Sequence, residues 1–185
     1  MRSDERIARG ALASDATCAP AYPCGVPNIN DPLFDEPREG EGFRCARARV
    51  SRQAGSERLG ASLWELPPHE AAYPYHYHLT EEELLIVLRG RPALRTPEGW
   101  RELSEGDVVP FLRGECGAHQ LVNKTQESVR FLAISTSGEP DVVIYPDSAK
   151  LGAYERRPDG SGLRAMFRMT DTVDYYEGEQ PPPRP

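Results

Sequence analysis

At 185 residues, the chain is long enough to bury one sizeable core but short for two complete domains. Its formal net charge of -7 comes from 22 Lys and Arg against 29 Asp and Glu, and no basic cluster is interleaved with aromatic residues. This balance argues against nucleic acid or an anionic membrane surface as a partner and favours a small molecule.

The N-terminal residues and the cysteines indicate the cellular compartment. No apolar run approaches the roughly 18 to 20 residues that span a bilayer. Charges such as Asp4, Arg6 and Asp15 interrupt any apolar signal segment at the start of the chain. We therefore expect a soluble, cytoplasmic protein. Four cysteines are too few for a disulfide scaffold at this length, so Cys18, Cys24 and the other two are expected to be mostly free thiols.

The chain divides into three parts by composition. Residues 1–40 are rich in Ala, Pro, Asp and Gly without periodicity, which predicts an irregular N-terminal arm. Residues 41–150 consist of short extended segments separated by Gly, Pro, Asp or Glu, with no convincing amphipathic helix. The strands expected there are 43–50, 59–66, 73–78, 83–88, 92–96, 100–103, 107–111, 119–122, 129–135 and 141–145. The prediction is one all-β barrel or sandwich domain.

Residues 151–185 are predicted to form a C-terminal extension. The stretch 146–170 shows no clear pattern. From Asp171 the chain is acidic and then proline-rich, which is the composition of a packed edge followed by a disordered Pro-rich end.

Residues 76–90 carry two histidines and a carboxylate beside an apolar, strand-like run. Side chains two apart on a strand point to the same face, so His76 and His78 can bind one ion. The polar residues 79–82 allow a bend, after which Glu83 shares a face with alternate apolar residues of the next strand. These three side chains form most of a metal site.

Two further positions decide how that site is completed. Glu82 is the alternative carboxylate, but Glu83 has the same parity as Leu85 and Val87 and therefore faces the interior with them. Among the remaining histidines, His119 opens a later strand and is the candidate third imidazole. His69 follows two prolines and is interpreted as a surface histidine.

The spacing of these residues resembles the two signature motifs of the cupin superfamily. The matching pattern is His76-x-His78-x4-Glu83-x6-Gly90, then Gly106 through Gly114 to His119-x3-Asn123. The 15 residues between the motifs, Arg91 to Glu105, have a length typical of small single-domain bacterial cupins. The pattern departs at Glu70, where glycine is usual, at Leu112, where proline is usual, and in the longer step from Gly114 to His119.

The resemblance implies a double-stranded β-helix, the cupin or jelly-roll barrel, and a homodimer. It also implies that His76, His78, Glu83 and His119 bind one divalent transition metal per chain and leave open positions for substrate. Imidazole and carboxylate ligands suit Fe, Mn, Ni, Cu or Zn rather than calcium.

Three functions follow from this ligand set. The first is a metal-dependent oxidoreductase of the dioxygenase type that acts on a small chelating organic substrate. The alternatives are a metal-dependent isomerase or decarboxylase, and a non-catalytic cupin that binds or senses a small ligand. The resemblance in fold does not choose among them.

Several other residues have two readings. Arg47 and Arg49 share one strand face and would bind a substrate carboxylate if that face were inward. Because Ala46, Ala48 and Val50 are available for the core, a solvated arginine face is expected instead. Cys116 is expected to be an ordinary half-buried cysteine. The aromatic residues Tyr73, Tyr75, Trp64 and Phe111 are expected to be core residues rather than a substrate-binding wall.

Overall fold

The computed structural model describes residues 26–138, 140–155 and 161–183. Within these residues the chain is almost entirely extended, which confirms the all-β prediction. The elements are β1 (Arg38–Gly40), β2 (Phe43–Ala48), α1 (Val50–Gln53), β3 (Leu59–Leu66), β4 (Tyr77–His78), β5 (Glu83–Arg89), β6 (Ala93–Thr96), β7 (Gly99–Glu102), β8 (Val108–Phe111), the 3-10 helix η1 (Glu115–Gly117), β9 (Gln120–Val122), β10 (Val129–Thr136), β11 (Asp141–Tyr145), the 3-10 helix η2 (Pro146–Ser148), β12 (Lys150–Tyr154) and β13 (Arg164–Arg168).

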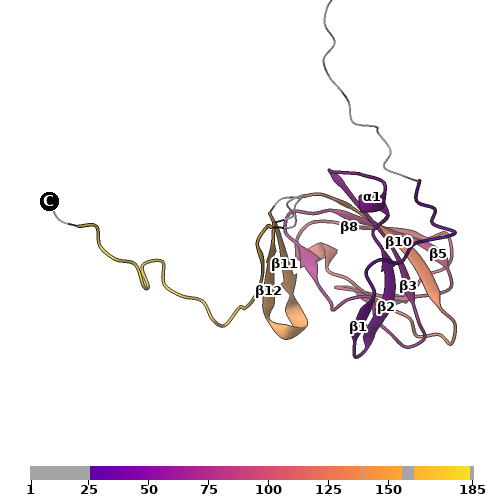
Figure 1. Cartoon of the computed structure of the whole chain (residues 1–185). Helices are drawn as coiled ribbons and strands as arrows, with labels where there is room; N and C mark the ends of the chain where they lie inside the picture. The colour runs from indigo at the N-terminus through magenta and orange to yellow at the C-terminus, as the bar shows by residue number, and fades with distance from the viewer. Residues whose placement is uncertain (1–25, 139, 156–160, 184–185) are drawn as a thin grey trace, which may run out of the picture.

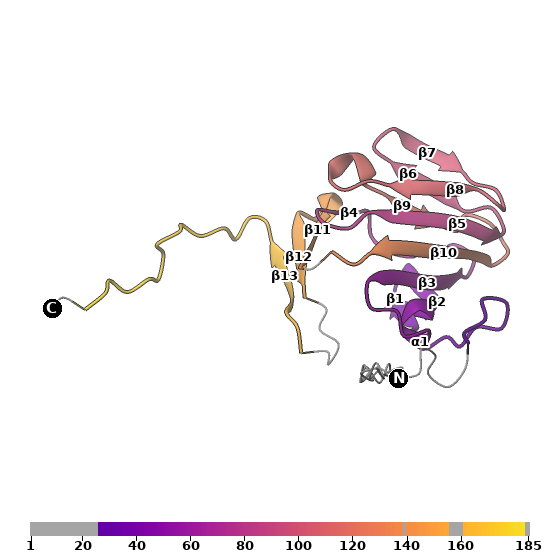
Figure 2. The ribbon, with the colours of Figure 1, turned by 90° about the horizontal axis from the view of Figure 1, so that it is seen from above.

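Two of the three antiparallel sheets enclose the main core. The larger sheet has the strand order β1-β2-β3-β10-β5-β8 and the smaller one β7-β6-β9, and β3, β10 and β5 lie side by side (Figure 2). Trp64, Leu85 and Phe131 from the larger sheet pack with Leu94 and Leu121 from the smaller one. Alternation of buried and half-buried residues along β5 places this apolar face inward.

The outer face of the larger sheet is also covered. Ala48 and Leu63 form a second apolar cluster there with Ile29 and Phe34 from the segment that precedes β1. Because this segment covers the outer face, the opposite face of β2 lies against the barrel core. Arg47 lies on that inward face, and the expectation of a solvated arginine face is wrong for this residue.

The third sheet, β13-β12-β11-β4, is built largely from the stretch that showed no sequence pattern. Strand β13 of this sheet is exposed at all positions but one. It therefore lacks the alternation of apolar residues from which a strand can be predicted. Beyond β13 the chain runs away from the barrel (Figure 1). The domain limits taken from composition stay predictions.

Some predictions concern residues outside the described ranges. Residues 1–25, with Cys18 and Cys24, are among them. Of the described cysteines, Cys45 is buried and Cys116 exposed, and both are free thiols as expected. In the described part of the chain, no helix is both long and apolar enough to cross a membrane.

Candidate metal centre

The backbone places two of the predicted histidines directly opposite each other. His76 and His119 form an isolated antiparallel bridge, in which the His76 N–H donates to the His119 carbonyl oxygen at 3.1 Å and the His119 N–H donates back at 2.9 Å. Directly opposed residues project their side chains to the same side of the ladder. His78 follows in β4, where it pairs with Val143 of β11.

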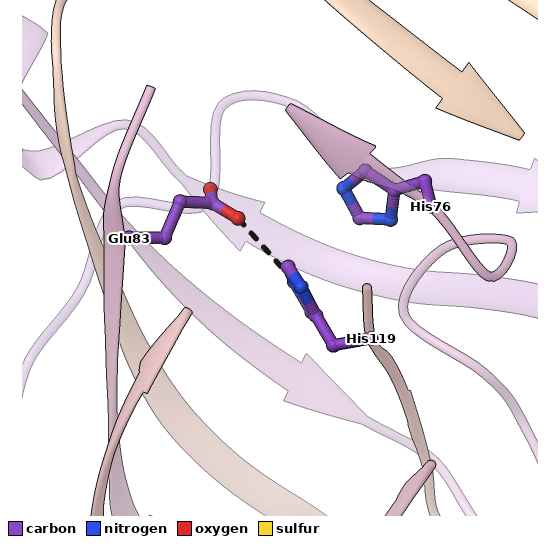
Figure 3. A group of neighbouring side chains, drawn as sticks. All are labelled: His76, Glu83 and His119. Carbon is purple, nitrogen blue, oxygen red and sulfur yellow. Dashed lines mark ion pairs between the residues drawn. The ribbon is translucent and has the colours of Figure 1, made fainter. Parts of the chain in front are cut away.

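Glu83 lies at the start of β5 and points toward these rings. Its Oε2 is 3.3 Å from His119 Nε2 and 3.6 Å from His78 Nε2. The ligand-type atoms of His76, Glu83 and His119 all lie within 4.8 Å of one another (Figure 3). Glu82 is exposed, and its backbone pairs with Thr136: its N–H donates to the Thr136 hydroxyl and its carbonyl oxygen accepts from the Thr136 N–H. The structure therefore brings Glu83, and not Glu82, to the histidines.

The Nδ1 atoms of the three histidines have oxygen partners. Backbone carbonyl oxygens lie 2.9 Å from Nδ1 of His76 and 3.0 Å from Nδ1 of His119, and the carboxylate of Asp141 lies 2.7 Å from Nδ1 of His78. In the neutral ring, an Nδ1–H that donates to oxygen leaves an electron pair on Nε2. This tautomer, inferred from the oxygen partners, presents an Nε2 lone pair for a metal.

The loop before His119 is shaped by a glycine. Gly117 ends η1, and its carbonyl oxygen is the partner of the His119 ring. A Cβ atom at this position would overlap the carbonyl oxygen of Leu112. The longer step from Gly114 to His119 thus contains a single-turn helix packed tightly against Leu112, the residue that follows β8.

Asp141 was missed as a site residue by sequence reasoning. It is fully buried, and the hydroxyl of Thr80 donates to its second oxygen at 2.9 Å. Buried Glu81 lies 3.8 Å from the same ring nitrogen of His78, and these three residues form a second ligand-type cluster. Because Nε2 of His78 faces Glu83, we interpret Asp141 as the group that orients this ring. An acidic residue opening the apolar strand at 141–145 was the available signal.

Aromatic side chains form the walls of the centre. Phe111 stacks on the His119 ring with centroids 3.6 Å apart, and Tyr73 meets His76 and His119 edge-on at 4.8 and 5.3 Å. Tyr145 stacks on His76 at 5.8 Å. Burial and the charge of Glu83 raise the pKa of Tyr73, which keeps its phenol protonated. Phe111 and Tyr73 therefore belong to the core, as expected, and also contact the histidine rings. Their role as a wall for substrate stays a prediction.

Electrostatics keeps these groups in the forms that bind cations. Burial and the charges of His119 and His78 lower the pKa of His76 to about 3. For Glu83, burial raises the pKa, but close contact with His119 and the charges of the histidines outweigh it and lower the pKa to about 2. At neutral pH His76 is neutral and Glu83 is ionised. The donor set therefore fits a divalent transition metal.

The lowered pKa of His76 predicts acid sensitivity of the metal-free protein. The unfolded chain binds this proton near pH 6.5 and the folded chain near pH 3. The free energy of unfolding should therefore fall as pH drops through that window, by about 1.4 kcal/mol per pH unit for one such group. Urea unfolding after chelation, followed from pH 6.5 down to pH 5.5, measures it above the range near pH 4.5 where Glu83 titrates in the unfolded chain. His76→Gln should flatten the slope, and an equally steep slope in that variant would contradict the assignment. His69→Gln is the control for losing an exposed histidine.

Cys116 does not lie where the sequence suggested. It is exposed on η1, with its sulfur 3.7 Å from the carbonyl oxygen of Arg113. The half-buried position expected for it is wrong, because η1 turns its side chain outward before the chain re-enters the barrel at His119.

Comparison with known proteins identifies the domain. A family model for the cupin domain matches residues 62–135. A proposed sugar phosphate isomerase from Acidithiobacillus ferrooxidans is 26% identical, with a TM-score of 0.64 over 72% of this chain and 81% of that one. A sugar phosphate isomerase of the cupin superfamily from Silicibacter pomeroyi is 23% identical, with a TM-score of 0.63 over 72% and 82% of the two chains. No curated protein matches the chain. The predicted double-stranded β-helix is confirmed.

Proposed function

We propose that this member of the cupin superfamily, which the family model matches over residues 62–135, is a metal-dependent isomerase of small phosphorylated sugars. The observation that carries the proposal is the cluster of His76, Glu83 and His119, whose ligand-type atoms converge within 4.8 Å beside the ring of Tyr73. The likeness to the Acidithiobacillus protein favours the isomerase over the other reactions.

In this proposal His76, His78, Glu83 and His119 hold one divalent transition metal. When bound, such an ion supplies Lewis-acid polarisation of a substrate carbonyl or hydroxyl oxygen. Glu83 is suited to hold the cation rather than to remove a proton, because a carboxylate with a pKa of about 2 is a weak base at neutral pH. Tyr73 donates a hydrogen bond to a substrate oxygen, and Asp141 holds the His78 ring in position.

A dioxygenase is the second candidate. Three imidazoles with one carboxylate also suit iron, and an iron centre with open positions would hold a chelating substrate beside O2. Isomerisation differs from it in a measurable way. It moves a proton between neighbouring carbons and needs no external oxidant.

The deciding experiment combines metal analysis with two assays of one sample. Protein purified without chelator is analysed for metal and then incubated in D2O with ribose 5-phosphate while oxygen is monitored. We expect deuterium to enter the carbon beside the carbonyl without oxygen uptake. Oxygen consumption across a panel of chelating substrates would support the dioxygenase instead. Ligand binding without either reaction would support a sensor.

We further propose that the protein is a homodimer whose C-terminal segment packs on a second copy. β13 and β1 are the last strands of their sheets, and unpaired edges of this kind are usually covered. The C-terminal segment beyond β13, residues 169–183, also carries four exposed large apolar residues, namely Met169, Val173, Tyr175 and Tyr176. Such a row is costly to leave in water. A second copy is favoured because the segment leaves its own barrel (Figure 2).

Light scattering at micromolar concentration should therefore give the mass of two chains. Truncation after Arg168 should give the mass of one, with metal content unchanged, because the segment lies apart from the metal centre. A monomeric full-length chain, or a truncated chain that still dimerises, would contradict the proposal. The cytoplasmic location stays a prediction.

A further inference from the structure

Two arginines of the larger sheet, half-buried Arg47 and exposed Arg38, lie beside one tryptophan. Strand register places Arg38 opposite Cys45 and Arg47 opposite Trp64. Cys45 and Trp64 belong to the barrel core. The backbones of both arginines therefore direct their side chains to the core-facing side of the sheet. The Arg38 guanidinium lies 4.9 Å and that of Arg47 4.6 Å from the centre of the Trp64 ring. The same indole therefore holds both cations.

This pair is short of negative charge. Arg47 forms an ion pair with Glu36 at 3.4 Å. The same carboxylate also pairs with Arg49 at 2.7 Å and with Arg52 at 3.9 Å. Among the described residues, Arg38 has no carboxylate within ion-pair distance. The remaining donors of Arg47 meet the hydroxyl of Ser62, at 3.2 and 2.9 Å, which adds no charge. Burial and the neighbouring arginines lower the pKa of Arg47 to about 10, so it remains charged at neutral pH.

The pair is connected to the metal centre through aromatic rings. Trp64 meets Tyr73 edge-on at 5.8 Å, and Tyr73 contacts both His76 and His119. Arg38 is near enough that its charge opposes the effect of burial on the pKa of Tyr73. The arginines thus contact Trp64 and the histidines contact Tyr73, so two touching aromatic rings connect the pair to the metal centre.

The separation suits a short, extended substrate. Arg47 lies on β2 and Glu83 on β5, and β3 and β10 stand between them. At roughly 4.8 Å per strand the backbones are about 14 Å apart along the sheet. The long side chains of Arg47 and Glu83 occupy part of this distance, and a phosphorylated sugar would have to fill the remainder.

The geometry points to Arg38 and Arg47 as the residues that bind the phosphate group of the substrate whose other end is held at the metal centre. This inference rests on the proposed function. Guanidinium groups match phosphate oxygens with paired hydrogen bonds, which favours arginine where an oxyanion must be oriented. Trp64 contributes a further donor, because its indole N–H is buried without a hydrogen-bond partner among the described residues.

The test measures phosphate binding separately from metal binding and turnover. The chain has two tryptophans, so Trp100→Phe leaves Trp64 as the single fluorescent indole. The metal-loaded full chain is titrated with inorganic phosphate, ribose 5-phosphate and ribose, and binding is followed by Trp64 emission and by calorimetry. Arg47→Gln, Arg38→Gln and Arg47→Lys are compared with Arg91→Gln. Arg91 pairs with Glu102 on the exposed surface and is the matched control for loss of one positive charge.

We expect Arg47→Gln and Arg38→Gln to lower the affinity for inorganic phosphate and for ribose 5-phosphate by roughly ten- to hundred-fold, because each removes charge-assisted hydrogen bonds. Arg47→Lys should recover only part of the affinity, because it keeps the charge and loses the planar fork. Ribose binding and metal content should be unchanged in all four variants. Arg91→Gln should bind like the parent.

Undiminished phosphate affinity in Arg38→Gln and Arg47→Lys would overturn the inference. These two variants settle it even if Arg47→Gln fails to fold, since Arg38 is exposed and Arg47→Lys is conservative. Tighter binding of malonate than of phosphate would also overturn it in favour of a carboxylate site. If phosphate binding depends on both arginines while deuterium exchange is absent, the isomerase proposal fails and the phosphate site stands.

Discussion

Glu83→Gln should weaken metal binding by roughly ten- to hundred-fold. Among the proposed ligands Glu83 is the one anionic group, and it lies close to two of the ring nitrogens, at 3.3 and 3.6 Å. Glutamine keeps the shape and an acceptor oxygen but removes the charge that offsets the cation. Metal analysis after dialysis, and competition with a chromophoric chelator, measure the change.

Glu82→Gln is the matched control. Glu82 is the preceding residue, is exposed, and carries the same charge. Its replacement should leave metal occupancy and any turnover unchanged. If Glu82→Gln lost metal and Glu83→Gln retained it, the strand register assigned to β5 would be wrong in solution.

The residues of the first motif were predictable because their geometry is local. Parity along a strand fixes which side chains share a face, and it separated Glu83 from Glu82 without knowledge of the fold. His119 was a candidate because it opens a later strand, but its place opposite His76 could not be derived from spacing, since the backbone bridge between them joins distant parts of the chain.

Asp141 was beyond such reasoning for a related cause. It lies 63 positions after His78 along the chain, and only the pairing of β11 with β4 brings it to that ring. Arg47 was misplaced because both faces of β2 are covered, so the small apolar residues on one face did not mark the only core. A single sequence reports the alternation of a strand but not what packs on each side of it.

The centre lies where the three sheets meet. Glu83 belongs to the larger sheet, His78 to the sheet of β11, and His119 lies just before β9 of the smaller one. A metal held by these residues would join all three sheets. Because a ligand that binds only the folded chain stabilises it, saturating metal should raise the melting temperature. The size of that increase reports how many of the ligands are intact.

His119→Ala should therefore have the largest effect, with metal affinity lowered by roughly 100-fold or more and little of the metal-dependent rise in melting temperature left. The substitution removes a ring that contacts Glu83 and stacks on Phe111, while the backbone bridge to His76 does not depend on the side chain. His69→Ala, which removes an exposed histidine, is the control. Metal-free circular dichroism of both variants separates ligand loss from unfolding. A folded His119→Ala protein with full metal content would exclude His119 as a ligand.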